Sequence, residues 1–85
     1  PEARFLNGLV VLSARRVLVA DSVRGAIWSF DPTTGALAIW LEDPALAVDP
    51  AVQPFRPAAN GLKLHGGMLY VSNSSRGAIY RIALT

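Results

Sequence analysis

Short apolar runs separated by polar turn residues recur along the first half of the chain. The runs cover residues 9–12, 17–20, 26–30 and 36–41. Runs of this length, rich in β-branched and aromatic residues and bounded by glycine, proline or aspartate, are typical of β-strands. The pattern therefore predicts four consecutive strands.

The second half repeats this pattern with one run fewer. Its apolar runs cover residues 62–64, 68–71 and 78–82. Gly66 and Gly67 separate the first two runs, and glycine supplies the positive φ that a tight hairpin needs. Asp31-Pro32-Thr33-Thr34-Gly35 in the first half is a similar turn signal, since proline presets φ and glycine closes the turn. We therefore expect antiparallel hairpins throughout.

The two halves are copies of one internal repeat. Asn7-Gly8-Leu9 recurs 53 residues later as Asn60-Gly61-Leu62, and residues 21–28 recur 52 residues later as 73–80. Four antiparallel strands joined by tight turns form one blade of a β-propeller. The sequence predicts an all-β fold of two consecutive blades, with the first at about 5–41 and an incomplete second at about 58–85. We expect this to be part of a larger propeller.

Residues 42–57 between the copies contain four prolines and two Asp-Pro steps. Proline breaks both helices and strands, so this segment is predicted to be a long loop, with one helical turn at 44–47.

The composition is apolar for a small domain, with 52% hydrophobic and 16% charged residues among 85. Propeller blades bury both faces against their neighbours, which explains near-continuous apolar strands. We expect the aromatic residues of the strands to pack between blades: Trp28, Phe30, Trp40, Tyr70 and Tyr80. The exposed blade faces should then bind the remaining blades or drive self-association.

Charge and composition argue against several other classes of protein. The net charge of +2 comes from basic residues spread along the chain, without the clustered patch of nucleic-acid binders. No apolar run approaches the roughly 20 residues of a membrane-spanning helix. Cysteine is absent, and no targeting signal is visible, so the localisation stays open.

The pattern Asn-Gly-Leu, strand, turn, Leu-Tyr-Val-Ser-Asn-Ser, Arg-Gly-Ala-Ile-Tyr-Arg-Ile resembles the senescence-marker-protein/gluconolactonase/luciferin-regenerating-enzyme family of six-bladed propellers. The resemblance extends from Phe5 to about Leu84 outside the proline-rich loop. The sequence of the second copy is especially similar to those of fungal members that are secreted or act in secondary metabolism.

The resemblance implies a divalent cation, calcium or zinc, at the mouth of the central channel. Asn7 matches an asparagine ligand of the family, and Asn60 stands where the family has an aspartate that is both ligand and general base. An amide oxygen can coordinate a cation, but it cannot take a proton from water. The family's glutamate ligand has no counterpart in this chain. The alternative is that both Asn-Gly steps are turns that start a strand, because both residues tolerate left-handed conformations.

Arg24 and Arg76 occupy equivalent places in the links that follow the second strand of each copy. They are candidates for binding the carboxylate or lactone oxygen of a small-molecule substrate at the same end as the Asn-Gly steps. The alternative is a solvated loop arginine. Asp21 and Asn73 precede them and are expected to bond the loop backbone in Asx-turns.

The remaining chemistry-bearing residues suggest no catalytic site. His65, the only histidine, falls in a turn at the opposite end from the Asn-Gly steps, so we expect a surface residue. Ser72, Ser74 and Ser75 form no Gly-x-Ser-x-Gly elbow.

Three functions remain open for the parent propeller. The leading hypothesis is a propeller that acts on a small organic molecule as a metal-assisted lactone or ester hydrolase, in which the cation polarises the carbonyl and activates water. The second is a metal-independent propeller that binds a small molecule or assists the cyclisation of a natural product. The third is a non-catalytic interaction scaffold, because the fold alone does not determine function.

Overall fold

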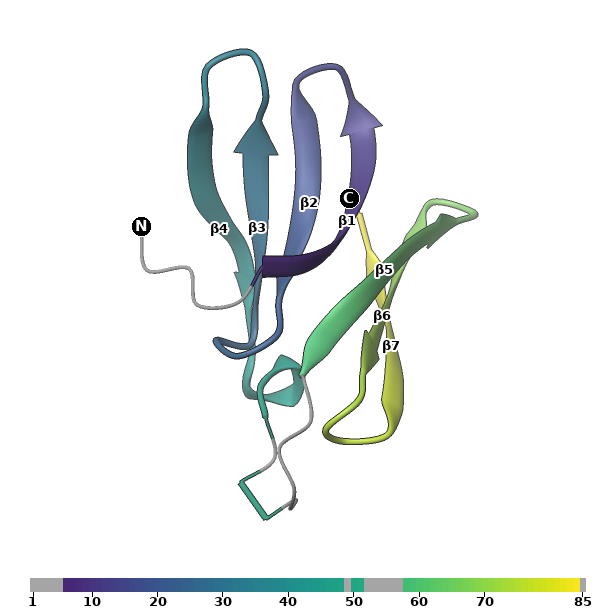
Figure 1. The fold of residues 1–85 in the computed structure, drawn as a ribbon. Coiled ribbons are helices and arrows are strands. Elements are labelled where there is room, and N and C mark those ends of the chain that lie inside the picture. Colours follow the sequence, from purple (N-terminus) through teal and green to yellow (C-terminus); the bar gives the residue numbers. More distant parts are fainter. Residues whose placement is uncertain (1–5, 49, 52–57, 85) are drawn as a thin grey trace.

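The computed structural model describes residues 6–48, 50–51 and 58–84, and its strands form two antiparallel meanders (Figure 1). The first sheet has four strands in the order β1-β2-β3-β4, and the second has three in the order β5-β6-β7. The predicted all-β fold of seven antiparallel strands is confirmed. Among the described residues, no helix is long and apolar enough to cross a membrane.

The strands begin and end close to the predicted positions. Their bounds are β1 Leu6–Ser13, β2 Arg16–Asp21, β3 Ala26–Asp31, β4 Ala36–Glu42, β5 Ala59–His65, β6 Met68–Asn73 and β7 Ala78–Ala83. The main difference is at β1 and β5, which both start earlier than expected and include the Asn-Gly steps. The register shifts at these steps, between Leu6 and Leu9 and between Ala59 and Gly61.

Glycines and aspartates close the turns as their sequence predicts. Gly66 and Gly67 join β5 to β6 with φ of 58° and 76°. Gly35, at φ 78°, ends the β3–β4 turn, where its N–H donates to the carbonyl oxygen of Asp31 at 2.8 Å. Both hairpins therefore use glycine for the left-handed conformation that other residues adopt at a cost.

The link between the sheets begins with a short 3-10 helix, η1 (Pro44–Leu46). Asp43 caps this helix, because its Oδ1 accepts a hydrogen bond from the Ala45 N–H at 2.8 Å. The predicted helical turn is confirmed. The rest of the predicted loop lies largely outside the described residues.

The core fills the space between the two sheets. Leu18, Ala20 and Ile27 of the first sheet pack in one cluster with buried residues of the second sheet and η1: Leu46, Ala59, Leu62, Leu69 and Val71. Trp40 and Tyr80 are half-buried at its edge. One face of each sheet is thus buried against the other, which holds the two meanders together.

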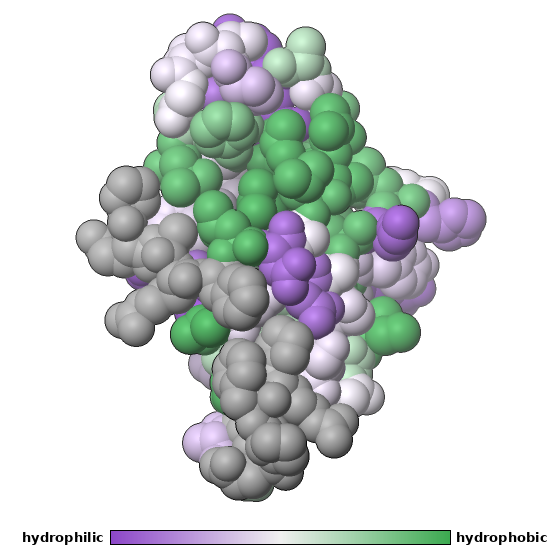
Figure 2. All heavy atoms as spheres, in the orientation of Figure 1, coloured by the Kyte–Doolittle hydropathy of each residue, from purple (hydrophilic) through white to green (hydrophobic). Residues whose placement is uncertain are grey.

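The opposite face of the first sheet is also apolar. Its residues form two rows across all four strands, and we call them the outer apolar face: Leu9, Val19, Trp28 and Ile39 in one row, and Val11, Val17, Phe30 and Leu37 in the other. Trp28 is buried at the centre, whereas Leu9 and Val11 are 59% and 60% exposed. Figure 2 shows apolar surface gathered over the region of β1–β4.

The expectation that the strand aromatics pack between blades holds for only two of them within this pair of sheets. Trp40 and Tyr80 contact the core between the sheets. Trp28 and Phe30 lie on the outer apolar face, and Tyr70 lies on the far side of the second sheet beside Lys63 and Ile79. The reason is the two-residue period of a strand, which points neighbouring residues to opposite faces.

Candidate functional site

The two Asn-Gly steps, far apart in sequence, meet where β1 passes β5. A methyl group added at Gly8 would overlap the carbonyl oxygen of Asn60 and would lie 3.2 Å from the Cα of Gly61. Only glycine permits this approach of the two backbones. The structure thus brings Asn7 and Asn60 to the same place, as the repeat predicted.

The alternative explanation of these steps is correct in placing both at the start of a strand, but the expected left-handed conformation is wrong. Neither asparagine has a positive φ, and Gly8 and Gly61 are not among the positive-φ glycines. Both steps lie inside strands at irregularities of the register. Gly8 is required for close backbone contact, and a methyl group at Gly61 would lie 2.6 Å from the Ser72 hydroxyl oxygen.

Asn7 takes part in a chain of hydrogen bonds that joins the sheets. Its Nδ2 donates to the Ser22 hydroxyl oxygen at 3.2 Å. The Ser22 hydroxyl in turn donates to the Ala59 carbonyl oxygen at 3.0 Å, and the Ala58 N–H donates to the Ser22 carbonyl oxygen at 2.8 Å. Ser22 is fully buried. The Asn7 amide therefore caps a structural link between β1, the β2–β3 turn and β5.

Asn60 is held at both ends of its amide by serines of its own sheet. Its Oδ1 accepts from the Ser72 hydroxyl at 2.9 Å, and its Nδ2 donates to the Ser74 hydroxyl oxygen at 2.9 Å. The Ser72 oxygen also accepts from the Gly61 N–H at 3.1 Å. The oxygen that would face a cation is thus already engaged by a hydroxyl donor.

Arg24 and Arg76 both lie in turns at the end that carries Asn60, and both bond to the protein itself. The Arg24 Nε donates to the Glu42 carboxylate at 2.9 Å, and its guanidinium lies 5.5 Å from the centre of the Trp28 ring. The Arg76 Nε donates to the Ala47 carbonyl oxygen at 3.1 Å. Arg24 thus ties its turn to the end of β4, and Arg76 ties its turn to the link between the sheets.

Asp21 and Asn73 form the expected Asx-turns. The Asp21 Oδ1 accepts from the backbone N–H groups of Val23 and Arg24 at 3.1 and 3.0 Å. The Asn73 Oδ1 accepts from the Arg76 N–H at 3.1 Å. Both side chains are buried, so these turns are internal struts that position Arg24 and Arg76.

The structural role of the serines was not predicted from the sequence. Ser22 and Ser72 hold the two asparagine side chains, although Ser72 was considered there only as a nucleophile. The signal was available in the repeat, because Ser22 and Ser74 are equivalent and both bond the asparagine of their own sheet. Because this serine recurs together with the Asn-Gly step, the repeat indicated a hydrogen bond between the serine and the asparagine of each copy.

His65 ends β5, next to the Gly66-Gly67 turn at the far end of the second sheet from Asn60. It is exposed, and its ring lies 6.3 Å from that of Tyr70 in a tilted arrangement. This placement agrees with the expected surface turn residue.

The donor set around the Asn-Gly steps does not fit a divalent cation by itself. Calcium takes six to eight oxygen ligands, several of them carboxylates, and zinc prefers histidine, cysteine and carboxylate. Within the described ranges, no group of three or more histidine, cysteine, aspartate or glutamate side chains is placed to hold a metal. Asn7 and Asn60 are neutral, so the metal site stays a prediction that needs ligands from elsewhere.

Comparison with known proteins adds no family to this picture. No family model matches the chain, and no curated protein matches it. The resemblance to gluconolactonase-like propellers therefore stays a prediction.

Proposed function

We propose that this chain is a two-sheet interaction unit of a β-propeller, whose outer apolar face is covered by another β-sheet. The proposal rests on one observation: equivalent residues of the two copies lie on equivalent faces, and that face is buried in the second sheet. The face of the second sheet that is buried against the first contains Leu62, Leu69, Val71, Tyr80 and Ile82. Their repeat equivalents are Leu9, Val17, Val19, Trp28 and Phe30, all on the outer apolar face.

The first sheet covers this surface in the second copy, whereas in the first copy the surface is exposed at Leu9, Val11 and Ile39 around a buried centre at Val17, Val19 and Trp28. Its partner in the covered case is an apolar sheet face that includes Leu18, Ala20 and Ile27. An apolar sheet of this kind is therefore the expected occupant of the outer apolar face. More than half of the surface of Leu9 and of Val11 is exposed to water. Removal of this apolar surface from water favours association.

The far face of the second sheet is a poor occupant. Where the first sheet has Val10, Leu18 and Ala20, the second has Lys63, Tyr70 and Ser72. Arg81 lies beside Tyr70 on this face. Packing it on the outer apolar face of another copy would remove the charges of Lys63 and Arg81 from water without a carboxylate partner. Two copies should therefore associate through their outer apolar faces as a closed dimer, because this contact leaves the charged faces in water.

The experiment is light scattering on the purified chain across micromolar concentrations. The unmodified chain should reach the mass of a dimer, and the double variant Leu9→Lys, Val11→Lys should be a folded monomer, with strand content checked by circular dichroism. Ile79→Lys is the matched control, because Ile79 is 74% exposed on the far face of the second sheet. A monomeric unmodified chain, or loss of the dimer in Ile79→Lys, would contradict the proposal.

The hydrolase hypothesis is a second candidate, supported by the meeting of Asn7 and Asn60 at one end of the molecule. In this candidate, a completed ring acts on a small-molecule lactone or ester, and carboxylates from other blades supply the charge and the base that the two amides lack. Calorimetric titration of this chain with calcium, zinc and manganese tests whether its residues bind a cation. Heat that disappears in Asn7→Ala supports the candidate, and absence of heat with all three metals argues against a site in this chain.

A further inference from the structure

The two Asn-Gly steps share a chemical reactivity, but the structure holds them differently. In such a step the backbone nitrogen of glycine can attack the Cγ carbon of the asparagine side chain, because glycine has no Cβ to hinder the approach. A bond forms between this nitrogen and Cγ, and the Cγ–Nδ2 bond breaks, so that Nδ2 leaves as ammonia with the proton of the glycine N–H. Water then opens the cyclic imide to aspartate or isoaspartate. Asparagine is accordingly a thermolabile residue.

Asn60 is poorly placed for this reaction, because both reacting groups are held. Its amide bonds Ser72 through Oδ1 and Ser74 through Nδ2, each at 2.9 Å. The attacking group, the Gly61 N–H, donates to the Ser72 hydroxyl oxygen at 3.1 Å. Gly61 is also paired with Ser72 across the sheet. The amide and the N–H must both give up these bonds before the nitrogen of Gly61 can reach Cγ.

Asn7 is held less firmly. It is exposed, whereas Asn60 is half-buried. Among contacts between described residues, the Asn7 amide makes one hydrogen bond, from Nδ2 to Ser22 at 3.2 Å. Asn7 and Gly8 lie in the register shift of β1, where the described pairing aligns neither of them with a residue of β2. Fewer interactions therefore oppose the attack here than at Asn60.

The products do not fit the link that Asn7 completes. The Ser22 hydroxyl gives its proton to the Ala59 carbonyl oxygen at 3.0 Å, so a carboxylate in place of the Asn7 amide would meet an oxygen without a proton to share. Isoaspartate also lengthens the main chain directly before Gly8, which is in close contact with the backbone of Asn60. Either product removes a hydrogen bond between β1 and the β2–β3 turn. Isoaspartate in addition displaces β1 from β5.

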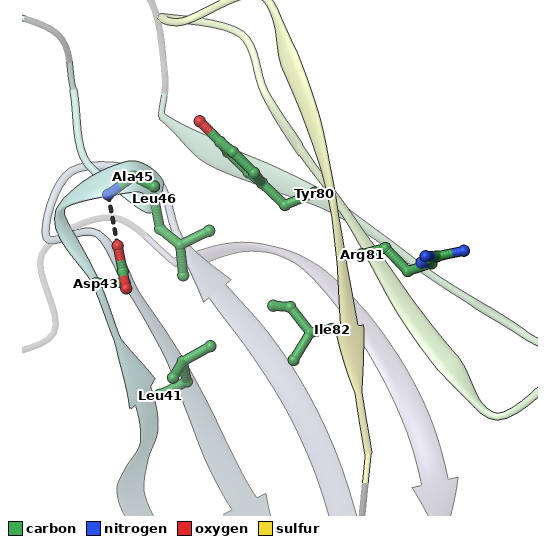
Figure 3. Close-up of a pocket in the computed structure, with 7 residues that line it drawn as sticks. All are labelled: Leu41, Asp43, Ala45, Leu46, Tyr80, Arg81 and Ile82. Atoms are coloured by element: carbon green, nitrogen blue, oxygen red, sulfur yellow. Dashed lines mark hydrogen bonds between the residues drawn. The ribbon is translucent and has the colours of Figure 1, made fainter.

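The opposite edge of the two sheets is held by other contacts. Figure 3 shows the side chains of Tyr80 and Ile82, from β7, pointing toward Leu41 at the end of β4 and toward η1. Tyr80 and Ile82 pack against the core between the sheets. In the same region the Asn73 Nδ2 donates to two carbonyl oxygens, one in η1 and one at its C-terminal cap. Loss of the contact at Asn7 should therefore open the β1–β5 edge without separating the sheets.

We propose that Asn7-Gly8 is a site of spontaneous covalent modification, and that conversion of Asn7 to aspartate or isoaspartate releases β1 from β5. The same step at Asn60-Gly61 is protected by its hydrogen bonds in the folded chain. The reaction needs only water, and it changes none of the residues of the outer apolar face.

The experiment is incubation of the purified chain in mildly alkaline buffer, followed by tryptic digestion and mass spectrometry. Trypsin places the two steps on separate peptides, each with a single asparagine. Labelling with an isoaspartyl methyltransferase measures the isoaspartate product. We expect Asn7 to be converted about tenfold faster than Asn60 in the folded chain, because the additional hydrogen bonds at Asn60 and Gly61 must break first. In concentrated urea the two rates should become equal.

The double variant Ser72→Ala, Ser74→Ala tests the protection of Asn60. It frees the Asn60 amide and the Gly61 N–H, and it should raise the rate at Asn60 toward the rate at Asn7. Circular dichroism checks that the variant is folded.

Amide hydrogen exchange tests the consequence of the modification. Ion exchange separates the converted chain through its added negative charge. Exchange should become faster along β1 and stay unchanged in β6, β7 and η1. Asn7→Gln is the matched control, because glutamine forms the larger cyclic imide far more slowly, so its exchange should not change during the incubation. Equal rates at the two steps in the folded chain, faster conversion of Asn60, or unchanged exchange in β1 after conversion would each overturn the proposal.

Discussion

Asp21 and Asn73 occupy equivalent positions in the two sheets, but their side chains bond in different ways. Asp21 only accepts: its Oδ2 takes a hydrogen bond from the Trp28 indole N–H at 3.2 Å. Asn73 also donates, because its Nδ2 bonds the carbonyl oxygens of Ala45 and Ala47 at 2.9 and 3.1 Å. Aspartate thus stands where the neighbouring group is a hydrogen-bond donor, and asparagine stands where the neighbouring groups are acceptors.

Asn73→Asp is expected to destabilise the fold strongly at neutral pH. A carboxylate at this buried position would face two carbonyl oxygens without a proton to donate, at a cost of about 3 kcal/mol or more in the free energy of unfolding. The loss should shrink as the pH falls, because the introduced carboxyl has a raised pKa in the folded state and can donate once protonated. Urea denaturation at several pH values measures both effects.

The matched control for this substitution is Asn73→Ala. It removes the same two donors without adding charge, so its effect should be smaller and independent of pH. Equal effects of the two variants across the pH range would show that the carbonyls of Ala45 and Ala47 do not select the amide.

The contact between Trp28 and Asp21 should contribute measurably to stability. Trp28→Phe keeps most of the buried ring but removes the indole N–H, and loss of a hydrogen bond to a buried carboxylate costs about 1–3 kcal/mol. A double-mutant cycle with Asp21→Asn isolates the pair, with an expected coupling of about 1 kcal/mol. Additive effects of the two substitutions would mean that the contact contributes nothing to folding.

Local sequence signals predicted the strands and turns because the forces that shape them are local. Gly66-Gly67 and Asp31 with Gly35 impose their hairpins through φ preferences and short-range hydrogen bonds. The Asx-turns of Asp21 and Asn73 were predicted for the same reason. In each case the residues that determine the structure lie within four positions of one another.

The orientation of the aromatics and the function of the Asn-Gly steps depended on contacts distant in sequence. Alternation indicated that Trp28 and Ile27 point to opposite faces, but not which face meets the second sheet. The requirement for Gly8 arises from the backbone of Asn60, on another sheet. Such requirements are visible only once the two sheets are placed together.

Asp31 should titrate below the usual pKa of an aspartate. The Thr33 hydroxyl and backbone N–H donate to its carboxylate at 2.6 and 2.8 Å, and together with the nearby Arg15 they lower the pKa. Because the pKa is lower in the folded state, this contribution to stability is present above the unfolded pKa and is lost as the pH falls through the folded one.

Carbon-detected NMR titration of the Asp31 carboxyl group tests this order of causes. Thr33→Val removes the hydroxyl donor and should raise the pKa toward its usual value, more than Arg15→Ala does, because Arg15 is exposed and its attraction is screened by water. A larger rise in Arg15→Ala would mean that charge, and not the threonine hydrogen bonds, lowers the pKa.

Gly8→Ala is expected to force β1 and β5 apart. The added methyl would meet the carbonyl oxygen of Asn60, which is part of the β5 backbone and cannot turn aside as a side chain can, so we expect a loss of about 2 kcal/mol or more in the free energy of unfolding. Gly61→Ala is the control: its methyl would meet only the Ser72 hydroxyl at 2.6 Å, and that side chain can turn aside at a loss of about 1 kcal/mol. Urea denaturation compares the two variants. If both lose the same stability, contact between the two Asn-Gly steps is not what requires glycine at position 8.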